Sequence, residues 1–203
     1  FFFSTGISSL VISNSSLPYA LPISLDQYSI IISLGLCALT ALVVASVIAY
    51  TCSRSLRVKM LGVDYYMYLQ VIGALALVST LGALAYEMVF LTPVCEYCWW
   101  QRVFMFPIVI ITGITLWKRI MGNELIIAVL ALLGAAFSVF QVCCHFQIHV
   151  LDNILSMPCS GGGIIPSCTE TPILIFGFIT IPLMALVVFV SILWVSYLAY
   201  KTR

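Results

Sequence analysis

The chain has 203 residues, of which 63% are hydrophobic and only 7% are charged, and its formal net charge is +1. A soluble globular domain carries about 25% charged residues, so this composition excludes a soluble domain and indicates a protein surrounded mostly by lipid. No basic stripe suggests a phosphate-bearing partner, so we expect the chain to contact membrane lipid and no nucleic acid.

Five apolar segments follow one another along the chain, at 29–50, 65–91, 100–117, 124–146 and 173–199. Each is close to the length of about 20 apolar residues that a helix needs to cross a bilayer. The second and the fifth exceed the hydrocarbon thickness, so we expect them to tilt or to extend past it. The sequence therefore predicts an all-α integral membrane protein with five spans.

Basic residues set the expected orientation of these spans. Seven of the eight lie between spans one and two, between spans three and four, or after span five: Arg54, Arg57, Lys59, Lys118, Arg119, Lys201 and Arg203. The positive-inside rule makes that side, with the C-terminus, cytoplasmic, so the N-terminus and the loops at 92–99 and 147–172 are expected outside. Arg102 is the exception. It either snorkels to the interface or has a partner, because an unpaired cation at a membrane boundary costs free energy.

The eight cysteines are distributed unevenly over this arrangement. Four lie in the loops expected outside, where an oxidising compartment lets disulfides persist: Cys95, Cys98, Cys159 and Cys168. Both pairs could be static bridges, and for the second pair, which encloses SGGGIIPS, that interpretation is fair. For the C-x-x-C pair it is weaker, because so small a ring restrains little chain entropy. A zinc site needs four ligands, commonly two C-x-x-C pairs, so the spacing favours a redox couple over a metal site.

The residues around Cys98 favour a reactive thiol. Span three is expected to begin near Trp99, which puts Cys98 at a helix N-terminus, where unpaired N–H groups and the helix dipole stabilise a thiolate. Arg102 follows one helical turn later on the same face, and it could hold the thiolate or an anionic acceptor. Trp99 and Trp100 fit an interfacial aromatic belt, although a flat ring could also stack there.

A dithiol that becomes a disulfide must pass on two electrons. The sequence has no haem-attachment C-x-x-C-H, no glycine-rich nucleotide fingerprint and no cluster-type cysteine spacing. The expected acceptor is therefore apolar and dissolved in the bilayer, and a quinone has these properties. This reasoning requires a cavity near the first cysteine pair that can admit such a molecule.

These residues resemble a known family. PVCEYCWWQRVFMFP, at 93–107, is similar to the start of the second core helix of DsbB/BdbC-type thiol:quinone oxidoreductases, with a C-x-x-C, aromatic residues and the pair Gln101 and Arg102. Glu87, within YEMVFLTP, resembles an acidic residue of BdbC-type members, and GFITIPLMAL, at 177–186, resembles the opening of their last helix.

The resemblance covers about residues 65–199 and implies a domain organisation. Residues 61–203 would form a DsbB-like four-helix transmembrane bundle with two outward redox loops. Residues 1–60 would form an extracytoplasmic N-terminal segment plus one extra transmembrane helix. The whole chain would be a multi-pass protein of the plasma membrane with five spans. Both ends of the core would be inside and its two loops outside, as the basic residues predict independently.

The resemblance also implies roles for the candidate residues. Cys159 and Cys168 would oxidise a thioredoxin-like extracytoplasmic thiol oxidoreductase of the DsbA/BdbD kind, with Cys159 forming the mixed disulfide. Electrons would pass to Cys95 and Cys98, and each step would be the attack of a thiolate on a disulfide sulfur. Cys98 would lie next to a quinone of the ubiquinone or menaquinone type. The residues implied beside that quinone are Arg102, which would polarise it, Gln101, Trp99 and His145.

Two other functions remain open. A non-catalytic subunit with the same fold would keep its cysteines as static bridges and use the extra helix to dock into a larger membrane complex. An enzyme of the vitamin K epoxide reductase type would carry its quinone-side C-x-x-C at the start of the last core helix, where TETPILIFGFITIP has none.

The segment around His145 is open to several interpretations. His145 and His149 are one turn apart beside Cys143 and Cys144, which is a ligand spacing, but adjacent cysteines on a helix point in different directions. We therefore expect no metal, and quinone contact or interfacial packing for His145. Cys143 and Cys144, like Cys37 and Cys52, are most simply small apolar residues. The stretch 146–158 either extends span four or lies along the interface.

Overall fold

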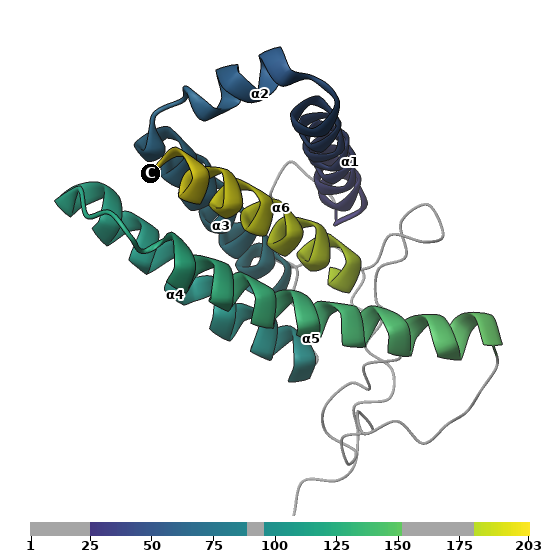
Figure 1. Cartoon of the computed structure of the whole chain (residues 1–203). Helices are drawn as coiled ribbons and strands as arrows, with labels where there is room; N and C mark the ends of the chain where they lie inside the picture. The colour runs from purple at the N-terminus through teal and green to yellow at the C-terminus, as the bar shows by residue number, and fades with distance from the viewer. Residues whose placement is uncertain (1–24, 89–95, 152–180) are drawn as a thin grey trace, which may run out of the picture.

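The computed structural model of the chain describes residues 25–88, 96–151 and 181–203, and within them the regular secondary structure is entirely helical (Figure 1). Five of the helices are long and apolar enough to cross a membrane, while α2 is a short connector. The predicted all-α membrane protein with five spans is therefore confirmed. The helices are α1 (Leu25–Cys52), α2 (Arg54–Leu61), α3 (Tyr65–Met88), α4 (Glu96–Lys118), α5 (Glu124–Leu151) and α6 (Ile181–Thr202).

Several helix boundaries differ by a few residues from the predicted ranges, and two of these differences concern the segments that carry candidate site residues. α4 begins at Glu96 instead of residue 100, so its first turn includes Cys98 and Trp99. α5 continues to Leu151, past the predicted end at 146, because the stretch FQIHVL has neither glycine nor proline to stop it. Figure 1 shows this green helix extending beyond the end of α6. The predicted end of span two after residue 88 and the predicted start of span five before 181 lie outside the described residues.

Four of the helices form a ring in which α3 packs against α4 and α6, and α5 also packs against α4 and α6. The core at its centre is mostly aliphatic, and its buried members include Tyr65, Leu69, Ile72, Ala76, Ile108, Ile127, Ala131, Phe189 and Ile192. α5 and α6 are in close contact at Gly134, where an added Cβ would overlap the ring of Phe189. Small residues allow membrane helices to come this close, and van der Waals contact then holds them together.

α1 lies outside this ring and packs against α6, and α2 connects it to α3 (Figure 1). It is the least buried of the five spans, because much of its surface faces away from the other helices. The fold is thus a four-helix bundle with one additional helix on its side, which is the architecture that the sequence predicts.

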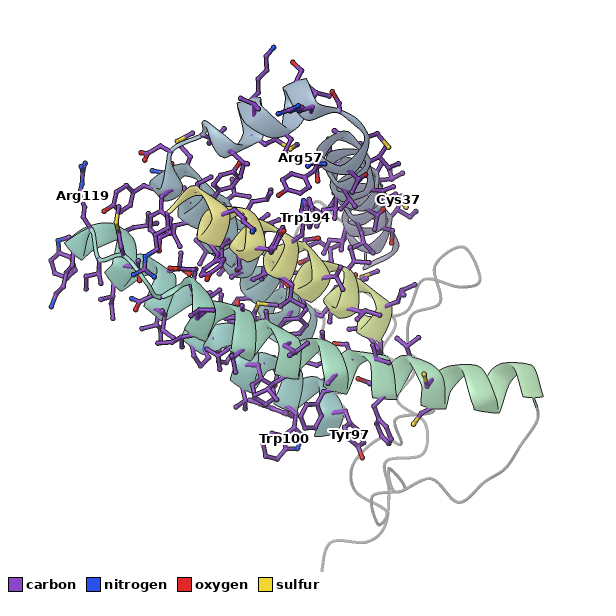
Figure 2. The ribbon with its side chains drawn as sticks, in the orientation of Figure 1. Cys37, Arg57, Tyr97, Trp100, Arg119 and Trp194 are labelled. Carbon is purple, nitrogen blue, oxygen red and sulfur yellow. The ribbon has the colours of Figure 1, made fainter. Side chains whose placement is uncertain are left out.

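One end of the bundle collects the basic residues, and we call it the basic end. Glu124, at the start of α5, is fully buried and accepts hydrogen bonds from Tyr65 Oη at 2.7 Å and from Arg203 Nη1 at 3.1 Å. Tyr66 Oη donates to the carbonyl of Arg119 at 2.9 Å. These bonds tie the start of α3, the α4–α5 connection and the C-terminus together. Figure 2 shows Arg57 and Arg119 well away from Tyr97 and Trp100, which lie near the start of α4.

Candidate functional site

Arg102 lies in the second turn of α4, and contacts with α3 hold its side chain in position. Its side chain is 9% exposed, and its Nη1 donates to Glu87 Oε2 in an ion pair while Nη2 donates to the carbonyl of Ala83 at 3.0 Å. The ring of Trp99 lies under the guanidinium, with 5.3 Å between Cζ and the ring centroid. Arg102, the one basic residue on the side expected outside, therefore has a partner, as a charge within an apolar region requires.

The sulfur of Cys98 has a hydrogen-bond donor on α5. Gln141 Nε2 lies 3.6 Å from Cys98 Sγ and donates to it, and Gln101 Nε2 donates to Gln141 Oε1 at 2.9 Å. Both glutamines are buried, at 4% and 5% exposure. Their amides therefore form a short chain that ends on the thiol. A donor pointed at sulfur stabilises its thiolate form, because hydrogen bonds to charged groups are the stronger ones.

This arrangement refines the expectation for Arg102. The sequence puts Arg102 and Cys98 one turn apart, and the structure has both in the first two turns of α4. However, the two hydrogen bonds of the guanidinium go to α3, whereas the sulfur receives its bond from α5. Gln141 was not predicted. The sequence feature that could have identified it is an amide side chain inside a strongly apolar span, where polar side chains are rare and often functional.

A cavity of about 650 Å³ lies beside these residues, between α1, α3, α4 and α6. Cys98, Gln101 and Arg102 line it from α4, and most of the remaining wall is aliphatic. Its size falls within the range of about 300–1,000 Å³ that is usual for ligand sites, as does its combination of apolar walls with a few polar groups. The cavity that the sequence argument requires next to the C-x-x-C segment is present.

The two tryptophans at the start of α4, Trp99 and Trp100, do not line this cavity. Trp100 is stacked on Phe137 of α5, with 5.9 Å between ring centroids and an interplanar angle of 12°. Trp99, 49% exposed, covers Arg102 and is not one of the residues that line the cavity. Both indoles therefore occupy positions that suit an aromatic belt at the membrane interface.

Four of the predicted site residues lie wholly or partly outside what the structure describes. Cys95, Cys159 and Cys168 lie outside the described residues, and so does the side chain of His145, although its backbone belongs to α5. Their roles stay predictions. Of the predicted site residues that the structure describes, it brings Cys98, Gln101 and Arg102 together around one cavity.

Comparisons with known proteins identify the family of this chain. A family model described as "Disulfide bond formation protein DsbB" matches residues 65–199, from the start of α3 almost to the end of α6. A probable disulfide formation protein of Coxiella burnetii (strain Dugway 5J108-111) is 36% identical over 111 residues, which are 55% of this chain and 72% of that protein.

Two relatives in Bacillus cover more of the chain. The probable disulfide formation protein C 1 of Bacillus anthracis is 30% identical over 128 residues, which are 62% of this chain and 86% of that protein. Its namesake in Bacillus cereus (strain ATCC 10987 / NRS 248) is 33% identical over 131 residues, with the same two shares. No solved structure matches the chain significantly. The family match spans more than half of the 203 residues and coincides with a helical membrane bundle, so the chain belongs to the DsbB family of disulfide bond formation proteins.

Proposed function

We propose that this protein is a membrane thiol:quinone oxidoreductase that reoxidises an extracytoplasmic thioredoxin-like disulfide donor. The observation that carries the proposal is the apolar cavity that Cys98 and Arg102 both line. A thiol at the wall of such a cavity can react with a lipid-soluble acceptor, because the apolar walls favour such a molecule. A quinone, when bound, supplies an acceptor for two electrons and two protons.

The residues of the cavity fit a quinone. The apolar walls suit the hydrocarbon parts of the molecule, and the polar groups on α4 suit its carbonyl oxygens. Arg102 has five N–H donors, of which α3 takes two, so N–H groups remain that can bond an acceptor oxygen. Glu87 fixes the guanidinium in position before any ligand arrives, which avoids the entropic cost of ordering it on binding.

The proposed route moves one electron pair through two disulfides. A donor dithiol attacks the Cys159–Cys168 disulfide through a mixed disulfide at Cys159 and leaves as a disulfide. The resulting dithiol reduces the Cys95–Cys98 disulfide in the same way. Reduced Cys98 then lies at the cavity wall, where the amide of Gln141 stabilises its thiolate. In sum, the donor loses two electrons and two protons, and the acceptor gains them.

Quinone reduction by the purified protein in lipid nanodiscs tests this route. A reduced thioredoxin-like protein serves as donor, and the absorbance of the quinone is the readout. We expect Cys98→Ser to abolish turnover and Cys143→Ser to leave it intact, because Cys143 is an exposed free thiol that does not line the cavity. Turnover that survives Cys98→Ser would refute the route. Cysteine pairs that stay oxidised in mild reductant would instead support the non-catalytic subunit.

The proposal also has an orientation, in which the basic end is cytoplasmic and the start of α4 faces outward. The tyrosine and carboxylate contacts that gather Arg119 and Arg203 at one end support it, because the positive-inside rule applies to such clusters. Cys52, an exposed free thiol at the end of α1, reports on this side. A membrane-impermeant maleimide should label Cys52 in inside-out vesicles and spare it in right-side-out vesicles; the reverse pattern would contradict the orientation.

A further inference from the structure

α1 is attached to the bundle near both of its ends. Near the first end, Tyr28 Oη donates to the carbonyl of Gly82 on α3 at 3.2 Å, and its ring packs edge-on against Tyr86, with 5.0 Å between centroids. Near the other end, Trp194 Nε1 of α6 donates to Ser46 Oγ at 2.8 Å. α1 is therefore held in a defined position against both α3 and α6.

Between these two attachments, α1 stands off from the bundle. At Gly35 no described atom would lie within 4 Å of an added Cβ, apart from the helix itself and its neighbours in the chain. The space there is the cavity already described. α1 lines it with Ile32, Gly35, Leu36, Ala38, Leu39 and Leu42, opposite residues of α3 and α6 that include Ala74, Val78, Ala185 and Val188.

The cavity is thus shared between two parts of the chain. Cys98 and Arg102 line it from α4, within the region that matches the DsbB family, whereas α1 precedes that region, which begins at residue 65. With no α1, the α3 and α6 walls of the cavity would face lipid directly. With α1 in position, an apolar ligand that reaches Cys98 has a protein wall along its lipid side.

We propose that the middle of α1 forms the lipid-side wall of the acceptor site and that its side chains set which quinone side chains the site accepts. The occupant of the space along α1 is the isoprenoid side chain of the quinone, whose ring lies by Cys98 and Arg102. Three features support this assignment: the wall is aliphatic, it is continuous with the polar end of the cavity, and it includes the small residues Gly35 and Ala38. The inference rests on the proposed function.

Ala38→Phe tests the inference because it puts a ring into the cavity, and Ala41→Phe is the matched control. Ala41 is on the same helix and is exposed, but it does not line the cavity. We measure the KM for a series of quinones that share the same head group and carry short or long isoprenoid side chains. Quinone binding is measured separately, by quenching of tryptophan fluorescence. A third readout, the rate of disulfide exchange with the donor, does not involve quinone.

For Ala38→Phe we expect the KM and the dissociation constant of the long-chain quinone to rise about tenfold or more, because an overfilled site must expand to admit the ligand. Disulfide exchange should stay unchanged, and Ala41→Phe should match the unmodified protein in all three assays. Values for Ala38→Phe that stay within about twofold for every side-chain length would overturn the inference.

Leu39→Ala provides a second test, since it enlarges the cavity and does not depend on the tolerance of Ala38 for a larger residue. It should alter the ratio of KM values between short-chain and long-chain quinones, and an unchanged ratio would contradict the proposed wall. The two proposals fail differently. If the unmodified protein neither binds nor reduces quinone, the proposed function fails; if it does both and the α1 variants behave like it, only the role of α1 fails.

Discussion

The ion pair between Arg102 and Glu87 should hold α4 to α3, and Glu87→Gln measures its contribution. The substitution keeps the shape of the side chain and an oxygen that can accept from Nη1, but it leaves the guanidinium without a counter-charge. Removing one partner of a buried pair costs about 3–5 kcal/mol. Because the Glu87 side chain is 33% exposed, we expect the lower value, about 3 kcal/mol.

Thermal unfolding in nanodiscs, followed by tryptophan fluorescence, gives the measurement. For a chain of this size, a loss of about 1 kcal/mol lowers Tm by roughly 2–4 °C, so Glu87→Gln should lower it by roughly 6–12 °C. Asp64→Asn, an exposed acid in the turn before α3, is the control and should change Tm little. The double variant Glu87→Gln/Arg102→Met should recover much of the loss, because it removes both charges. A double variant that is less stable than Glu87→Gln alone would refute the reasoning.

Two further changes test the neighbouring contacts. Gln141→Leu removes the donor to Cys98 Sγ and should slow alkylation of reduced Cys98 about tenfold, since a hydrogen bond to a charged group contributes about 1.5 kcal/mol or more. Mass spectrometry of labelled peptides measures the rate. An unchanged rate would show that the amide does not activate the thiol. Gly134→Ala should destabilise the bundle by about 1–3 kcal/mol through overlap with the ring of Phe189, whereas Gly113→Ala, which meets no described atom within 4 Å, should not. Equal Tm values for the two glycine variants would contradict the close approach of α5 and α6.

The spans could be predicted because crossing a bilayer depends on the length and apolarity of each segment, which a sequence displays directly. Helix ends were harder. The predicted start of span three at 100 follows from where the apolar run begins, but α4 starts at Glu96 because a helix can begin with polar residues outside the hydrocarbon. Cys98 nevertheless lies in the first turn of α4, so it is at a helix N-terminus, which is the position that the argument for a reactive thiol requires.

The partners within the site were only partly predictable. Arg102 stood out as the cation on the unexpected side, and the resemblance pointed to Glu87, but nothing local indicates that these side chains meet across two helices. Gln141 was missed for the same reason, because a single amide in an apolar span has no periodic pattern. The cavity is a property of four facing helices, and no single helix carries its signature.

The thiol and the guanidinium of α4 are held from opposite sides, and this separation has a kinetic consequence. Gln141 on α5 bonds the sulfur of Cys98, whereas Glu87 on α3 bonds Arg102, so the two hydrogen bonds reach α4 from different helices. If the two hydrogen bonds act independently, substitutions that remove them should act additively. Gln141→Leu should therefore slow the reaction of the thiol with little change in the KM for quinone, and Glu87→Gln should raise that KM with little change in thiol alkylation. The double variant should show the product of the two effects on kcat/KM. A departure of more than about threefold from that product would mean that the two polar contacts form one coupled network through α4 rather than two independent ones.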